Sequence, residues 1–320
     1  MSIKRFVDEN YKHFNARALA NAARAYRDHV NSGGKMFVTL AGAMSTAELG
    51  LSLSEMIRRG FVSGISCTGA NLEEDLFNAV ASSKYKIIEN YRDLTPSDEL
   101  ALLNSGMNRV TDTCIPEVEA MAKVDSYIPE LWKDASRNGL SKLPHEFVFE
   151  MVLSNEFQRE FETDPDASWV LAAAKNNVPL FVPGWEDSTL GNFFVSKVLK
   201  EQVTINTVRS GLSYMIKLVD WFKAAENEGK VGFFQIGGGI AGDFPICVVP
   251  LIEQDLGEKT QLWSYFCQIT DAQESYGGYS GALPNEKITW GKIAPDAPKF
   301  VIHSDATIVA PLVFQYVLEA

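Results

Sequence analysis

The stretch Val231-Gly-Phe-Phe-Gln-Ile-Gly-Gly-Gly-Ile-Ala-Gly242 joins an apolar run to a cluster of glycines. Its first six residues have the length and composition of a buried strand, and the glycines that follow have the spacing G-x-G-x-x-G. In that pattern the missing side chains let the backbone approach a pyrophosphate, and the amino terminus of a following helix can face it. The stretch therefore predicts a strand, a ligand-binding turn and a helix.

Five further apolar runs have strand length, and helical patterns separate most of them. Regular alternation of strands and helices predicts an α/β fold, a doubly wound parallel sheet with helices on both faces. We expect residues 1–320 to form a single domain, preceded by an amphipathic helical segment in the first 35 residues. The five runs are residues 36–42, 62–66, 178–183, 261–270 and 299–303.

Small or polar residues follow each predicted strand, and ligands of such sheets bind beyond the carboxyl ends of the strands. Two of these turns also have a structural explanation. Ser45-Thr-Ala-Glu48 has the form of a capping box that opens a helix, and Glu74 can complement the dipole of a helix that starts near Asn71. The turns are Gly42 to Ser45, Thr68 to Asp75, Gly184 to Asn192, Gly237 to Gly239, Asp271-Ala272 and Ser304 to Ala306.

Composition narrows the classes of function. The net charge of -12 argues against nucleic-acid binding and suits a cationic substrate. No apolar run is long enough for a membrane span and no signal peptide is visible, so we expect a soluble cytoplasmic protein. The four cysteines and four histidines lack ligand spacing, which argues against a metal site.

The segment from Tyr276 to Ile293 contains four glycines and a proline, so we expect a loop. Inside it lies Trp290-Gly-Lys292. An amine against an aromatic wall loses solvation, which lowers its pKa and lets it attack a carbonyl or imine carbon. Lys292 is the candidate nucleophile, and the alternative is a solvated lysine beside a packed tryptophan.

The run Ser280-Gly-Ala-x-Pro-x-Glu-x-x-x-Trp-Gly-Lys-Ile293, followed by Ser304-Asp-Ala-Thr307 and Pro311-Leu312, resembles the carboxy-terminal signature of the deoxyhypusine synthase family. The resemblance implies a Rossmann-like fold, NAD as cofactor, and a homotetramer with active sites between paired subunits. It also implies that Lys292 forms an imine with the butylamine unit of a polyamine, with Trp290 and Glu286 beside the substrate.

The same resemblance covers nearly the whole chain and implies a set of residues around NAD. Those residues belong to the turns that follow the predicted strands. They are Gly42, Ser45, Thr68, Glu74, Asp187, Gly237, Gly238, Gly239, Asp271, Ala272 and Asp305.

The sequence departs from the family pattern where the amine would bind. Asn192, Tyr276 and Tyr279 stand where the family has aspartates, and Asp243 and Cys247 stand where it has a histidine and an asparagine. Asp243 can accept a proton in place of that histidine if burial raises its pKa, or it can cap a helix before the following proline. Fewer carboxylates predict weak binding of spermidine.

Two classes of function remain open from the sequence. The first is an NAD-dependent aminobutyl transferase that acts on a polyamine or related amine. Its acceptor is either a small amine, as in homospermidine-forming relatives, or the translation-factor lysine of true deoxyhypusine synthases. The second is a dinucleotide-binding regulatory protein without catalysis. The substitutions favour the second class, and the retained surroundings of Lys292 favour the first.

Overall fold

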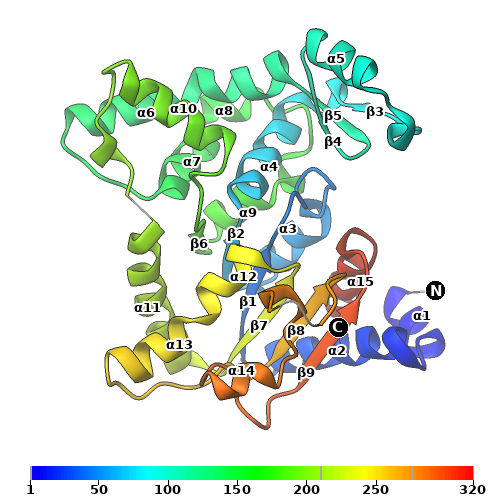
Figure 1. Ribbon diagram of the computed structural model, residues 1–320. Coiled ribbons are helices and arrows are strands. Elements are labelled where there is room, and N and C mark those ends of the chain that lie inside the picture. The colour runs from blue at the N-terminus through cyan, green and yellow to red at the C-terminus, as the bar shows by residue number, and fades with distance from the viewer. Residues whose placement is uncertain (1, 210, 275–276, 320) are drawn as a thin grey trace.

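The computed structural model describes residues 2–209, 211–274 and 277–319. Its centre is a six-stranded parallel sheet of order β6-β2-β1-β7-β8-β9, which confirms the predicted parallel sheet (Figure 1). Numbered along the chain, these strands run 3-2-1-4-5-6, the order of dinucleotide-binding Rossmann folds, with the reversal between β1 and β7. The strands are β1 (Lys35–Leu40), β2 (Gly64–Cys67), β6 (Leu180–Phe181), β7 (Val231–Ile236), β8 (Phe266–Thr270) and β9 (Lys299–His303).

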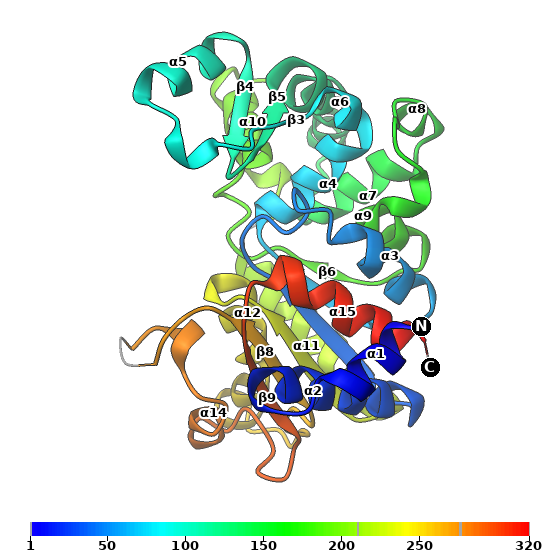
Figure 2. The same ribbon diagram turned by 90° about the vertical axis from the view of Figure 1, so that its right-hand side faces the viewer.

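Adjacent phenylalanines of β7 show how both faces of the sheet are covered. Phe233 contacts Trp263 at a ring-centroid distance of 4.8 Å, on the face beneath α11 and α12. Phe234 points the other way and contacts Tyr26 of α2 at 5.3 Å. In Figure 2, α2 and α15 lie on the near side of the sheet and α11 lies behind it. The predicted helices on both faces are therefore confirmed. These helices are α2 (Phe14–Asn31), α15 (Ala306–Leu318), α11 (Gly211–Glu228) and α12 (Gly239–Ile246).

The chain between β2 and β6 forms an upper part of helices and a three-stranded antiparallel sheet of order β3-β5-β4 (Figure 1). The sequence analysis did not predict this sheet, and the helix that starts at Pro96 has a capping box formed by Thr95 and Asp98. Its strands are β3 (Lys86–Ile87), β4 (Met107–Val110) and β5 (Thr113–Pro116). The helices here are α4 (Gly69–Ala81), α5 (Pro96–Asn104), α6 (Lys123–Arg137), α7 (Pro144–Leu153), α8 (Asn155–Gln158) and α9 (Trp169–Lys175).

Shorter elements complete the chain. The remaining α-helices are α1 (Ile3–Asn10), α3 (Gly50–Arg58), α10 (Thr189–Leu199), α13 (Val248–Pro250) and α14 (Glu286–Thr289). Single 3-10 turns are Ser82–Lys84, Tyr91–Asp93, Pro165–Ala167, Ile205–Thr207 and Tyr279–Gly281, and π-helical turns are Glu117–Ala122 and Leu251–Asp255. Within the described residues, no helix combines the length and apolar character needed to cross a bilayer.

One local prediction was wrong because tertiary contacts override the local pattern. The helix expected to open at Ser45 begins instead at Gly50, and Ser45 is buried. The Ser45 hydroxyl donates to the carbonyl of Asn71 at 2.6 Å and accepts from the indole Nε1 of Trp169 at 2.9 Å.

Candidate active site

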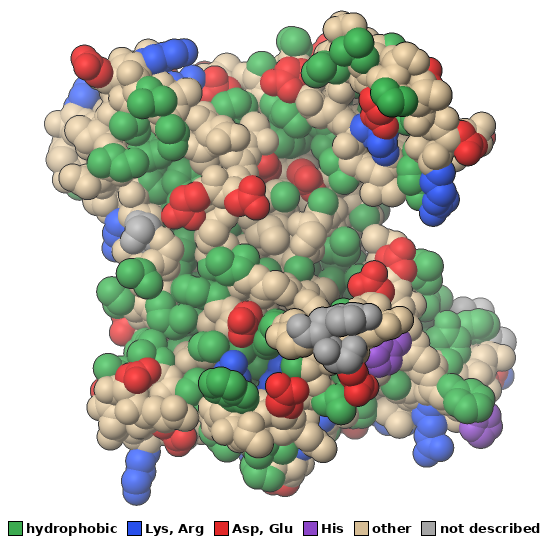
Figure 3. All heavy atoms as spheres, in the orientation of Figure 1, with side chains coloured by type: hydrophobic (Ala, Val, Ile, Leu, Met, Phe, Trp, Pro, Cys, Tyr) green, Lys and Arg blue, Asp and Glu red, His purple; other side chains and the backbone are tan. Residues whose placement is uncertain are grey.

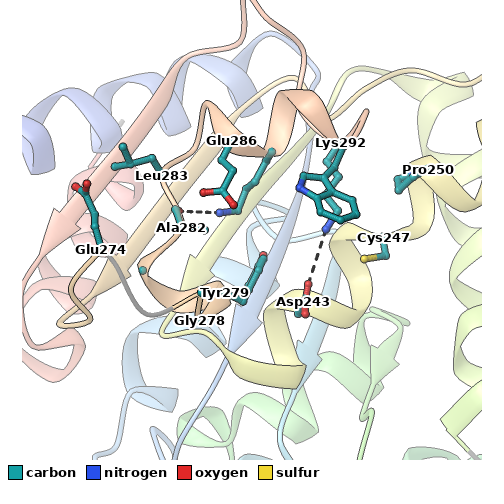
Figure 4. Close-up of a pocket in the computed structure, with 14 residues that line it drawn as sticks. Asp243, Cys247, Pro250, Glu274, Gly278, Tyr279, Ala282, Leu283, Glu286 and Lys292 are labelled. Carbon is teal, nitrogen blue, oxygen red and sulfur yellow. Dashed lines mark hydrogen bonds and ion pairs between the residues drawn. The ribbon is translucent and has the colours of Figure 1, made fainter.

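A cavity of about 580 Å³ lies between α12 and the segment that precedes β9. This volume suits a small organic molecule. Helix α12 and the residues just after it contribute Asp243 and Cys247, and the later segment contributes Tyr279, Lys287 and Lys292 (Figure 4). The cavity therefore contains the lysine that the sequence identified as the nucleophile.

Backbone contacts fix the position of Lys292. Gly291 takes a φ of +66°, which lets the chain turn sharply after α14. The Lys292 amide donates to the carbonyl of Lys287 at 3.1 Å, and its carbonyl accepts from the amide of Trp263 at 3.0 Å. Trp263 precedes β8, so Lys292 is anchored near the amino end of that strand. Its side chain then extends along the sheet face toward α12 (Figure 4).

The amine of Lys292 lies among one carboxylate and two aromatic rings. Its Nζ is 3.8 Å from Oδ1 of Asp243, 5.6 Å from the ring centroid of Trp290 and 6.0 Å from that of Tyr279. The residue is 8% exposed, so the interpretation of Lys292 as a solvated loop lysine is wrong. Asp243 lies inside α12, so its interpretation as a helix cap is also wrong.

Lys287 is a second lysine in the cavity, and the sequence analysis missed it. It is 3% exposed, and its Nζ donates to the carbonyl of Ala282 at 3.0 Å. The same Nζ lies 4.8 Å from the ring centroid of Tyr279 and 5.1 Å from that of Phe266. Burial, assisted by the charge of Lys292, lowers the pKa of Lys287 to about 8. The signal in the sequence was a pair of lysines five residues apart around Trp290.

The tyrosine at 279 is a neutral wall of the cavity. Its hydroxyl donates to Oε1 of Gln235 at 2.7 Å, and burial holds its pKa well above the usual value. Burial also raises the pKa of the Cys247 thiol, and the nearby charge of Lys292 partly opposes that change. Tyr279 and Cys247 thus bring no negative charge to the amine at neutral pH.

The remaining predicted substrate residues divide into three groups. Glu286 and Trp290 line the cavity, and both are exposed, with 62% of Trp290 accessible. Asn192 lies on α10, outside the set of residues that line the cavity. Tyr276 lies outside the described residues. In the space-filling view, basic side chains near the centre of the lower half are recessed among hydrophobic and acidic ones, whereas others project at the margins (Figure 3).

The glycine-rich turn after β7 is explained partly by packing. A side chain at Gly238 would meet Oγ of Ser280 at 1.7 Å, and one at Gly237 would meet Cβ of Ala41 at 2.9 Å. Gly239 differs, because it has a φ of +59° and no atom within 4 Å of an added Cβ. No side chain caps the amino terminus of α12, so its first N–H groups can receive a phosphate there.

Other predicted cofactor residues gather around the reversal between β1 and β7. Gly42, with a φ of +63°, follows β1, and its carbonyl accepts from the hydroxyl of Thr68 at 2.8 Å. Glu74 is buried, and its Oε2 has no hydrogen-bond partner among the described residues. Burial raises the pKa of Glu74 to about 7. An unpaired buried carboxyl oxygen is an acceptor for a ligand hydroxyl.

The last predicted cofactor residues lie at strand ends and in turns. Asp187 and Asp271 are exposed after β6 and β8, and the amide of Ala272 donates to the hydroxyl of Thr270 at 3.1 Å. Asp305 caps α15, since its Oδ1 accepts from the amide of Thr307 at 2.8 Å. Across the described part of the chain, no group of three or more His, Cys, Asp or Glu side chains gathers as metal ligands.

Comparisons with known proteins give the family. The family model for deoxyhypusine synthase matches residues 8–317. "Probable deoxyhypusine synthase 1" of Archaeoglobus fulgidus is 27% identical over 96% of this chain and 90% of its own length. "Deoxyhypusine synthase-like protein" of Nostoc sp. is 28% identical over 99% of this chain and 82% of its own length.

A solved structure agrees with the fold. The "putative deoxyhypusine synthase" from Entamoeba histolytica superposes with a TM-score of 0.60 at 12% identity, over 100% of this chain and 94% of that one. At this identity the match supports the fold alone. Because the family model spans nearly all of the sequence, the chain belongs to the deoxyhypusine synthase family.

Proposed function

We propose that the protein is an NAD-dependent alkylamine transferase, of the aminobutyl-transferring kind, that works through an imine on Lys292. The observation that carries the proposal is the placement of Lys292. Its amine is nine-tenths buried, faces a cavity of about 580 Å³ and lies 3.8 Å from the carboxylate of Asp243. Membership of a transferase family supports the same reaction class.

The residues of the cavity have separate tasks in this reaction. The Asp243 side chain is 51% exposed, so the burial that would make it a proton acceptor is absent, and its carboxylate instead positions the Lys292 amine, which loses its proton to solvent before it reacts. The Lys292 nitrogen then bonds to the oxidised carbon of the donor amine, the original C–N bond breaks, and the leaving amine departs with a proton. An acceptor amine later displaces Lys292 in the same way, and the carbon then regains the hydride that it lost at the start, so that the product is an amine. Trp290 and Tyr279 limit the access of water to this carbon.

The residues around the β1 and β7 reversal fit NAD, which supplies the hydride acceptor when it is bound. The unpaired Oε2 of Glu74 can accept from a ribose hydroxyl, and Gly239 leaves room for the backbone of α12 to approach a phosphate. Gly42 and Thr68 would lie beside them. Ser45, Gly237 and Gly238 would support the turns. We propose Asp187, Asp271, Ala272 and Asp305 as further contacts.

Asn192 lies on α10 and is not among the residues that line the cavity of its own chain, so the proposal for the assembly rests on the family resemblance. We therefore propose a homo-oligomer, a tetramer as the family resemblance implies, with the amine site near a subunit boundary.

The decisive experiment is reductive trapping of the imine. The protein is incubated with NAD and each of a panel of polyamines, reduced with borohydride and digested, and the modified lysine is located by mass spectrometry. A polyamine-dependent alkylamine adduct on Lys292 is the expected result. An NAD-binding protein that forms no adduct with any amine would instead be the regulatory protein left open by the sequence.

A further inference from the structure

Lys287 provides a cation in the cavity beyond the reactive lysine. We propose that Lys287 is a specificity-determining residue that binds a carboxylate of the substrate, so that the cavity takes an amino-carboxylate in preference to a polycation. This inference rests on the proposed function for the reaction at Lys292. It adds the chemical class of the amine that binds beside that residue.

The hydrogen bonds of Lys287 are the first argument. A lysine ammonium has three N–H donors, and among the described residues one protein acceptor is found for Lys287, the carbonyl of Ala282 at 3.0 Å. The rings of Tyr279 and Phe266 offer only their faces, at centroid distances of 4.8 and 5.1 Å. Because Lys287 lines the cavity, its remaining donors are available to a ligand there.

The distribution of acids is the second argument. Within the described part of the chain, no carboxylate lies within 4.0 Å of the Lys287 amine, although Asp243 lies within that distance of Lys292. The carboxylates lining the cavity, on Asp243, Glu274 and Glu286, belong to exposed residues, whereas both lysines are buried. A buried charge is stabilised by a counter-ion, and a carboxylate of the substrate is well suited to pair with the buried ammonium of Lys287.

The cavity therefore combines buried lysines with exposed acids. A substrate ammonium is attracted to the exposed acids, and a substrate carboxylate is attracted to Lys287. A polycation would place a positive group near two buried lysines and the uncharged phenol of Tyr279. The electrostatics thus select a molecule with both an amine and a carboxylate.

The test uses two probes that share the same diaminobutane skeleton and differ by one carboxylate, ornithine and putrescine. Calorimetry in the presence of NAD measures the affinity of each for the parent, Lys287→Met and Lys287→Arg. The parent should bind ornithine at least about tenfold more tightly than putrescine, as expected for a charge-assisted hydrogen bond. The Arg variant should keep this preference, and the Met variant should lose it.

A pH series separates charge recognition from a purely structural role. The pKa of about 8 means that Lys287 loses its charge above that pH, whereas arginine does not. The preference of the parent for ornithine over putrescine should therefore fall between pH 7 and 9 relative to the preference of the Arg variant. Because both proteins meet the same ligands at each pH, this comparison cancels the titration of the ligands themselves. Thermal melting confirms that each variant is folded.

Each outcome has one meaning. Equal affinities for the two probes, binding of neither probe, or a preference that survives in Lys287→Met would overturn the inference. Borohydride trapping is a separate readout on the same samples. A carboxylate preference without any adduct on Lys292 would refute the transferase mechanism while leaving the assignment of Lys287 intact.

Discussion

Replacing Lys292 with alanine should abolish the imine while leaving the fold intact. The change removes three methylene groups from a residue that is 8% exposed, which costs at most about 2.4 kcal/mol at roughly 0.8 kcal/mol for each group. Loss of the ion pair adds less than about 1 kcal/mol, because the Asp243 side chain is 51% exposed. A domain of ordinary stability, about 5–15 kcal/mol, remains folded after this loss.

The assay is reductive trapping with an amine that modifies the parent, combined with NAD binding. Lys292→Ala should give no adduct and retain NAD binding, because the proposed cofactor contacts lie on other turns. Lys299→Ala is the matched control. Lys299 lies outside the cavity and donates to the carbonyls of Pro295 at 2.7 Å and Ala297 at 2.9 Å, so its loss also removes lysine packing. A full adduct yield in Lys292→Ala would refute the imine mechanism.

Three other measurements probe the cofactor, a buried acid and the core. NAD at a hundred times its dissociation constant should raise the free energy of unfolding by about 2.7 kcal/mol. Glu74→Gln should require more NAD for the same rise. The absence of a thermal shift at millimolar NAD would contradict the cofactor proposal. Burial raises the pKa of Asp75 to about 6, so its contribution to stability is full below about pH 3.8 and is lost as pH rises through 6. Asp75→Asn should remove that pH dependence from urea unfolding, and an unchanged pH profile would show that another group causes it. Phe233→Ala should cost about 3–5 kcal/mol in urea unfolding, and a cost below about 1 kcal/mol would contradict its place in the core.

The sheet was predictable because each of its strands is a local pattern. Runs such as Val231–Ile236 are apolar throughout, as expected for a parallel strand that is covered on both faces. The antiparallel strands Met107–Val110 and Thr113–Pro116 lack this pattern, because the first is only partly buried and both mix polar with apolar side chains. Their pairing depends on a turn that the sequence analysis did not identify.

The candidate site also combines a residue that a local motif identifies with a residue that only the fold reveals. Lys292 was identified from the motif around Trp290, and the structure places it in a cavity with Asp243, which the sequence had proposed in place of the family histidine if it were buried. Lys287 was missed because the pair of lysines around Trp290 gives no indication that the first of them is buried. Its burial depends on Tyr279 and on Phe266 of a strand twenty residues earlier in the chain.

The sequence alone determined the six parallel strands, the order in which they follow and the candidate lysine, because periodicity and short motifs are properties of neighbouring residues. Only the tertiary structure decided which glycines face open space, which serine is buried and which charges share a cavity. Gly238 packs against Ser280, and Ser45 against Trp169, although each pair is well separated along the chain. Such contacts depend on how distant segments pack, since burial and electrostatics act through space and not along the chain.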